Sequence, residues 1–292
     1  MINLTIKRHY QMAEFSPSPT RTVLLAGVGR SGTTWIGDVL AHVLHARILF
    51  EPDLTDANGL LLKGQPIAGH WHERPSALWQ TTLFEAHRQD VHHMLFGNLH
   101  GGWVNQDAKS GIYHRRLVKS VRSSLYVGHI ARTWPEMKIL YLVRSPQPVI
   151  ESMLAKISDG WHFDWSADDI RHLLDHHPIL ANRIKPAWEP VSLIDRLALR
   201  YCIETHVALT ELEHCQNAMV IRYEQLARQT DWPAVGEFLQ DQGWDQAPAA
   251  DVLQRPSHTG SRLADDSHGL SASQVARLQN CVAAFGLDRW LA

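Results

Sequence analysis

The sequence predicts an α/β protein with a mostly parallel sheet flanked by helices in three layers. Short apolar runs alternate with stretches of helical periodicity, which is the pattern of βα units. Residues 138–143 (Lys-Ile-Leu-Tyr-Leu-Val) form an almost continuous apolar run, as strands buried on both faces of a parallel sheet do. A glycine-rich turn also joins the first predicted strand to the first predicted helix.

In the first half of the chain, residues 22–26 are the first apolar strand. After the turn, apolar residues recur at helical spacing from Trp35 to Leu44, which predicts a helix that packs on the sheet. Residues 47–50 are a second strand that ends at Glu51, because the next residue is a proline, which cannot donate to a strand ladder. Residues 53–110 are rich in Gly, His and Trp and predict an insertion of loops and short helices that shapes a cavity.

In the second half, further strands are predicted at residues 117–119, 138–143 and 218–222. Helices are predicted at residues 125–133, from 149 to 157, at 194–213 and at 271–285. Residues 160–190 form a second Trp- and His-containing insertion, and residues 255–269 form a polar loop.

Length and composition limit the class of protein. A chain of 292 residues is near the upper limit for one hydrophobic core, so we expect a single domain over residues 1–292 with an N-terminal arm at 1–20. The formal net charge of −2 argues against a nucleic-acid partner. The arm has no signal-peptide core, and no run approaches the roughly 20 apolar residues of a membrane helix. We expect a cytoplasmic protein without a membrane partner; no pattern specifies the oligomeric state.

The turn after the first strand is a candidate anion site with a P-loop-NTPase-like arrangement. It directs backbone N–H groups to one point at the positive end of the following helix. A nucleotide triphosphatase loop places a lysine after its last glycine, but Thr33 stands there, and the cation is Arg30 inside the loop. The loop therefore predicts a phosphate site without the Mg-ATP machinery.

Each of the other four predicted strands also ends in, or is followed by, a polar residue. In parallel sheets, ligands bind beyond the carboxyl ends of the strands, where these side chains would gather. They are Glu51, Lys119, Arg144 and Tyr223.

Together these segments resemble the sulfotransferase superfamily that uses 3′-phosphoadenosine 5′-phosphosulfate (PAPS). Residues 29–35 (Gly-Arg-Ser-Gly-Thr-Thr-Trp) are similar to its loop for the 5′-phosphosulfate, in the Arg form of carbohydrate and tyrosyl-protein sulfotransferases. Arg144 with Ser152 is similar to its 3′-phosphate motif, and residues 222–226 are similar to a third segment that follows the last core strand. The resemblance implies a hydroxyl sulfotransferase that releases adenosine 3′,5′-bisphosphate (PAP) and requires no metal. The residues that it implies for donor binding are Gly29, Arg30, Ser31, Gly32, Thr33, Thr34, Trp35, Arg144, Ser152, Tyr223 and Arg262.

Sulfuryl transfer needs a base for the acceptor hydroxyl and positive charge on the leaving oxygen. Cytosolic small-molecule enzymes of the superfamily use a His two residues after a Lys; Lys119 matches that Lys, but Val121 stands in place of the His. The resemblance implies Glu51 as the base instead, with Lys119 and Arg30 at the leaving oxygen. Tyr223 would border the adenine.

Several alternatives remain open at this stage. His70 or His72 is an alternative base, and a structural ion pair is the alternative role for Glu51. Arg122 would contact the donor or an anionic acceptor, and residues 255–269, including Arg262, would form a lid over PAPS. The acceptor would be a sugar, a tyrosine or a small natural product. The competing functions are a nucleotide-loop kinase, which needs a Lys at position 33, and a non-catalytic adenosine-bisphosphate-binding module.

Overall fold

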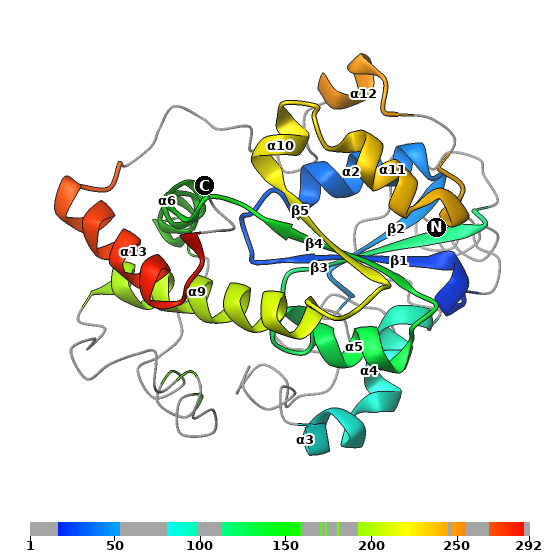
Figure 1. Ribbon diagram of the computed structural model, residues 1–292, viewed down its shortest axis with the longest axis horizontal. Helices are drawn as coiled ribbons and strands as arrows, with labels where there is room; N and C mark the ends of the chain where they lie inside the picture. The colour runs from blue at the N-terminus through cyan, green and yellow to red at the C-terminus, as the bar shows by residue number, and fades with distance from the viewer. Residues whose placement is uncertain are drawn as a thin grey trace, which may run out of the picture.

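The computed structural model describes residues 17–52, 81–97, 113–158, 192–244, 247–254 and 269–288, with isolated positions at 160, 170, 173 and 180. In these residues one five-stranded sheet is flanked by helices on both faces, which confirms the predicted α/β fold (Figure 1). The strand order is β2-β3-β1-β4-β5, and every strand pairing is parallel. The carboxyl ends of all five strands therefore lie along one edge of the sheet.

The strands follow the apolar runs of the sequence. Their bounds are β1 (Thr22–Gly27), β2 (Ala46–Phe50), β3 (Arg115–Ser120), β4 (Lys138–Val143) and β5 (Ala218–Arg222). All six residues of β1 are buried, because β1 is central and pairs with β3 and β4. The register places Leu25 beside both Lys119 and Leu140, so the polar end of β3 lies next to the turn that follows β1.

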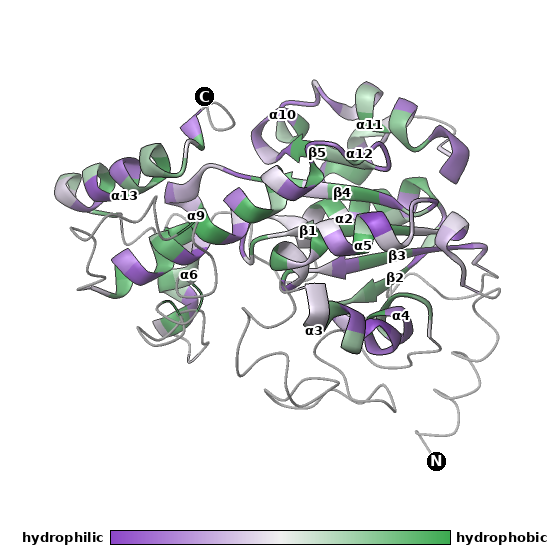
Figure 2. Cartoon of the chain, turned by 60° about the horizontal axis from the view of Figure 1, so that its bottom comes forward, coloured by the Kyte–Doolittle hydropathy of each residue, from purple (hydrophilic) through white to green (hydrophobic). Residues whose placement is uncertain are grey.

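One face of the sheet is covered by α2 and by helices from the C-terminal third of the chain. Their bounds are α2 (Thr33–Val43), α10 (Tyr223–Ala227), α11 (Trp232–Phe238) and α12 (Ala250–Gln254). Ile36 and Leu40 of α2 pack against sheet residues such as Leu25 in one core cluster, as the helical spacing of the sequence predicts. Figure 2 shows that the helices around the sheet carry both green and purple residues.

The other face carries a second core cluster. Its helices are α3 (Thr81–Ala86), α4 (Arg88–Phe96), α5 (Val127–Thr133), α6 (Pro146–Ser158), α9 (Leu193–Leu212) and α13 (Ala272–Ala284). Short 3-10 helices complete the described structure: η1 (Pro19–Arg21), η3 (Ser123–Leu125) and η4 (Gln240–Gln242). Phe84 and Val91 of the 53–110 insertion lie in this core, so the described part of that insertion belongs to the helical layer.

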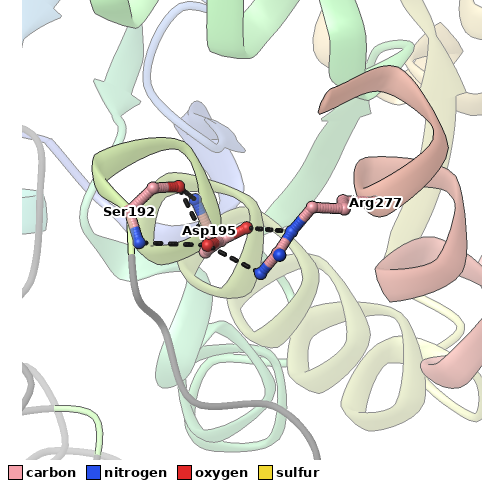
Figure 3. Close-up of polar contacts among 3 residues, drawn as sticks. All are labelled: Ser192, Asp195 and Arg277. Carbon is pink, nitrogen blue, oxygen red and sulfur yellow. Dashed lines mark hydrogen bonds and ion pairs between the residues drawn. The ribbon is translucent and has the colours of Figure 1, made fainter. Parts of the chain in front are cut away.

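A carboxylate at the start of α9 connects this helix to α13 (Figure 3). Ser192 and Asp195 form a capping box, in which each side chain accepts a hydrogen bond from the backbone N–H of the other. The Arg277 guanidinium donates to both oxygens of Asp195, with N–O distances of 2.9 and 2.8 Å. Asp195 is 3% exposed, so Arg277 neutralises a buried charge and fixes α13 on α9.

Two of the predicted helices differ from the sequence prediction, and α10, α11 and α12 were not predicted. The helix expected at 125–133 is divided into η3 and α5, with Tyr126 between them. The helix expected from 149 already begins at Pro146, because proline is well tolerated at the first position of a helix, where no intrahelical N–H bond is lost. In the described ranges, no helix is long and apolar enough to cross a membrane.

Candidate functional site at the carboxyl edge of the sheet

The turn between β1 and α2 is held in a shape that only small residues allow. Gly32 has a φ of 95°, in the left-handed region, and precedes the first residue of α2. A Cβ at Gly32 would lie 2.5 Å from the ring of Tyr223, and a Cβ at Gly27 would lie 2.7 Å from the carbonyl oxygen of Leu142. The two glycines therefore let the turn lie against β4 and the start of α10.

Arg30 turns its side chain toward the helix that carries Ser152. Arg30 has a φ of 72°, which is uncommon for a residue with a side chain. Its Nε donates to Ser152 Oγ at 3.0 Å, and its carbonyl oxygen accepts a bond from Arg144 Nη1 at 3.3 Å. Direct contacts thus bring the predicted 5′-phosphosulfate loop and the predicted 3′-phosphate motif together, although Arg30 and Ser152 lie far apart in the sequence.

The two guanidinium groups form a compact source of positive charge. Burial and the neighbouring Arg144 guanidinium lower the pKa of Arg30, and the Glu51 carboxylate partly opposes this effect. Within the described residues, the Arg30 and Arg144 side chains donate no hydrogen bonds beyond the two above, although each guanidinium has five N–H groups. Arg144 is also 8% exposed. An anion at this position would accept several charge-assisted hydrogen bonds and reduce the repulsion between the two cations.

Glu51 and Lys119 form an ion pair between Nζ and Oε1 at the ends of β2 and β3. The backbone N–H of Glu51 also donates to the carbonyl oxygen of Lys119 at 2.7 Å, which extends the ladder by one bond. Lys119 is 2% exposed, and its Nζ lies 4.0 Å from the ring centroid of Phe50. The Lys119 end of the ion pair is therefore well shielded from water, whereas the Glu51 side chain is 15% exposed. The second carboxylate oxygen of Glu51 accepts no hydrogen bond from the described residues.

Glu51 has a strained backbone as well. Its φ is 47°, and only four non-glycine residues of the described chain have a positive φ. Arg30 and Glu51 are two of these four. Strained backbone of this kind is often maintained where a side chain must point at a ligand, so it supports a functional role for both residues.

Tyr223 lies at the centre of the site. The Arg144 guanidinium lies over its ring, with the carbon atom 4.3 Å from the ring centroid. Trp35 packs against it edge to face, with ring centroids 5.7 Å apart. The Tyr223 ring thus contacts both the predicted 5′-phosphosulfate loop segment and the predicted 3′-phosphate motif. The sequence did not predict these contacts.

The structure places the remaining predicted residues as follows. Ser31 in the turn and Thr33 at the start of α2 are buried, and Gly29 is a buried glycine of the turn. Thr34 is half-buried on the first turn of α2, and Arg122 is exposed after β3. Arg262, His70 and His72 lie outside the described residues, as do most of residues 53–110 and 160–190 and all of the predicted lid except Gly269.

Two residues that contact the site were given no role from the sequence. The Glu224 carboxylate accepts the backbone N–H of Ser145 at 2.8 Å, and the Tyr201 hydroxyl donates to the carbonyl oxygen of Arg144. Glu224 belongs to the 222–226 segment and was visible as part of that motif. Tyr201 lies within a long apolar helix, so its periodicity indicated only a core residue.

The residues present fit a nucleotide with two separate anionic groups. Ser31 Oγ is buried in the turn and has no hydrogen-bond partner among the described residues, which is unusual for a buried hydroxyl and fits an acceptor supplied by a ligand. The Arg30 and Arg144 donors that the described residues leave unoccupied fit the same ligand class. Within the described chain, no group of three or more His, Cys, Asp or Glu side chains gathers in a way that could hold a metal ion.

Comparisons with known proteins identify a family. The model of the family described as "Sulfotransferase family" matches residues 22–231, which is more than half of the chain. No curated protein matches this chain.

Similar solved structures include a sulfotransferase from Alicyclobacillus acidocaldarius, with 16% identity, a TM-score of 0.46, and coverage of 92% of this chain and 96% of that one. Sulfotransferase STF1 from Mycobacterium tuberculosis matches with 12% identity and a TM-score of 0.47, over 97% of this chain and 79% of that one. Mouse sulfotransferase SULT7A1 complexed with PAP matches with 15% identity and a TM-score of 0.35, over 84% of this chain and 65% of that one.

Proposed function

The chain belongs to the sulfotransferase family, and from this premise we propose that it transfers a sulfuryl group from PAPS to a hydroxyl acceptor. The single observation that carries the proposal is the pair of adjacent guanidinium groups, Arg30 and Arg144, at the carboxyl edge of the sheet. PAPS has one anionic group at the 5′ position and another at the 3′ position of the same adenosine. A site with two cations on two neighbouring strand ends suits this separation.

Donor binding is assigned to two groups of residues. The turn N–H groups, Arg30, Ser31, Thr33 and Thr34 would hold the 5′-phosphosulfate. Arg144 and Ser152 would hold the 3′-phosphate, and the contact between Arg30 and Ser152 would be exchanged for contacts with the donor. When bound, PAPS supplies a sulfuryl group attached to phosphate through a bridging oxygen.

The chemistry is assigned to Glu51, Lys119 and Arg30. Glu51 takes the proton of the acceptor hydroxyl as its oxygen attacks sulfur, and the bond between sulfur and the bridging oxygen breaks. Lys119 and Arg30 stabilise the negative charge that develops on that oxygen. The ion pair with Lys119 orients the Glu51 carboxylate through Oε1 and leaves its other oxygen for the proton. The products are a sulfate ester and PAP, and no step requires a metal.

The test is turnover with PAPS and a panel of hydroxyl acceptors that contains sugars, tyrosine peptides and small phenols and alcohols. Mass spectrometry should detect at least one acceptor that gains one SO₃ group, with an equal amount of PAP released. Mg-ATP serves as the control donor and should give no phosphorylated product. Phosphorylation from Mg-ATP would instead support the kinase, and PAP binding without any turnover would support the non-catalytic module.

A further inference from the structure

The ammonium group of Lys119 is held by two consecutive residues at the end of β2. Phe50 is the register partner of Lys119 between β2 and β3, and Lys119 Nζ lies over its ring, 4.0 Å from the centroid. The next residue, Glu51, forms an ion pair with the same Nζ through Oε1. One buried cation is therefore in contact with an aromatic face and a carboxylate that are adjacent in the sequence.

The left-handed backbone at Glu51 accounts for this double contact. Successive side chains of a strand point to opposite faces of the sheet, so a regular continuation of β2 would separate Phe50 from Glu51. Phe50 is on the face of Lys119, because register partners in a sheet point to the same face. The φ of 47° at Glu51 breaks the alternation, and its carboxylate also reaches Nζ. The unusual backbone thus brings both residues to one ammonium group.

Core packing does not explain the Phe50 ring. Within the described residues, Ile48 and Leu49 of β2 belong to the two hydrophobic core clusters, whereas Phe50 belongs to neither of them. Phe50 is half-buried at the last position of the strand, and Lys119 is 2% exposed. The feature that distinguishes the ring is therefore its contact with a buried cation.

The ring stabilises this cation without neutralising it. A buried ammonium group loses the hydration that stabilises its charge, and the negative face of an aromatic ring replaces part of that hydration. Nζ has three N–H groups, and within the described chain its one hydrogen-bond acceptor is the Glu51 carboxylate. A second carboxylate in place of Phe50 would compete for the remaining N–H groups, whereas the ring keeps a full positive charge available to a further oxygen.

We propose that Phe50 is a positioning residue for sulfuryl transfer, whose ring holds the Lys119 ammonium group charged and oriented toward the leaving oxygen. This inference rests on the proposed function, which assigns the leaving oxygen to Lys119. Two other roles of the ring make different predictions. A purely structural ring contributes to stability alone, and a ring that lines the acceptor pocket contributes to acceptor binding.

The test replaces Phe50 with phenylalanine analogues that carry one, two or three ring fluorines. Fluorine withdraws electrons from the face of the ring and changes its size little, so the series weakens the cation–π contact in steps. The rate constant is measured in a single turnover, with the protein in excess over PAPS and with the fastest acceptor of the panel above at saturation. It should fall about twofold for each added fluorine.

Two further quantities should stay unchanged along the series. They are the acceptor concentration that gives half of the maximal rate and the midpoint of urea unfolding. The reason is that the leaving oxygen acquires its negative charge only in the transition state, so a weaker Lys119 contact affects the rate and not the binding of the acceptor. A structural ring would not respond to fluorine in this way.

Phe238 provides the matched control. Lys138 Nζ lies over the Phe238 ring, 4.8 Å from its centroid, so the two contacts are of the same kind. Lys138 is the first residue of β4, at the amino end of the strand and away from the site. The same fluorinated analogues at Phe238 should leave the rate constant unchanged.

Two natural substitutions extend the series. Phe50→Leu removes the ring and should lower the rate constant about tenfold, and Phe50→Tyr keeps the ring and should retain most of the rate. If Phe50→Leu does not fold, the fluorinated series, which is nearly isosteric with the wild type, still decides the question.

The results that would overturn the inference are a rate constant that does not change along the Phe50 series, an equal decrease in the Phe238 series, or weaker acceptor binding at a constant maximal rate. A wild-type protein that transfers no sulfuryl group from PAPS to any acceptor of the panel would overturn the proposed function itself. The two failures are therefore distinguishable.

Discussion

Glu51→Gln separates the catalytic role of the Glu51–Lys119 pair from its structural role. The substitution removes the proton acceptor, so kcat should fall by about 10²–10⁴-fold. It also leaves Lys119, which is 2% exposed, without its counter-charge. Losing one partner of a buried ion pair costs about 3–5 kcal/mol, and the lower end applies here because the amide oxygen of Gln still accepts a hydrogen bond from Nζ.

This cost leaves a folded protein if the wild type has the usual stability of about 5–15 kcal/mol. The loss of activity should therefore exceed by far any loss of folded protein, as measured by urea unfolding and by steady-state turnover on the same samples. The double variant Glu51→Gln with Lys119→Met replaces the pair with neutral side chains. It should recover most of the stability, because neutral replacements of buried pairs are often well tolerated, and none of the activity.

The outcome that refutes this reasoning is equally specific. If the activity of Glu51→Gln decreases only in proportion to its folded fraction, Glu51 is a structural partner of Lys119 and the base lies elsewhere. The side chains of His70 and His72, outside the described residues, would then be the next to test.

Three further predictions concern the scaffold. Gly32→Ala combines a left-handed φ with a Cβ 2.5 Å from Tyr223 and should weaken PAP binding. Gly160→Ala has a similar φ of 85° and no atom of the described residues within 4 Å of its Cβ, so it should lose only about 1–2 kcal/mol of stability and no binding. Arg277→Leu leaves the buried Asp195 without its guanidinium and should lower the free energy of unfolding by about 2 kcal/mol, seen as a lower urea midpoint with unchanged PAP binding. Burial raises the pKa of Glu204 despite Arg200, so the folded state holds this proton more tightly than the unfolded state. The corresponding stability is fully present below the unfolded pKa of about 4.5 and is lost as the pH rises through the folded value, and Glu204→Gln should flatten this part of the stability–pH curve.

The elements that follow from local pattern were predictable from the sequence. β4 was found with its exact bounds because five buried residues in succession, after Lys138, leave an unambiguous apolar run. The strand-end positions of Glu51, Arg144 and Tyr223 followed from the same runs. The start of α6 was placed at Val149, three residues too late, because the prediction followed the apolar spacing and made no use of Pro146, which is favourable at the first helical position.

The contacts within the site were not predictable in this way. The bond from Arg30 to Ser152 depends on a left-handed backbone at Arg30 and on the packing of α6, neither of which has a local signature. The cation–π contact of Tyr223 arises because β4 and β5 are neighbours, which places the residues after both strands side by side. The sequence identified which residues to examine, and the strand order of the sheet determined which of them come into contact.

The most direct test of the account is whether the site distinguishes PAP, which has phosphates at the 3′ and 5′ positions, from adenosine 5′-monophosphate (AMP), which has only the 5′-phosphate. Calorimetric titration of the wild type and of Arg144→Ala with PAP and with AMP measures this. The account predicts that the wild type binds PAP at least about tenfold more tightly than AMP, and that Arg144→Ala removes most of this difference while AMP binding persists. Equal affinity of the wild type for both nucleotides, or equal losses for both in Arg144→Ala, would contradict it.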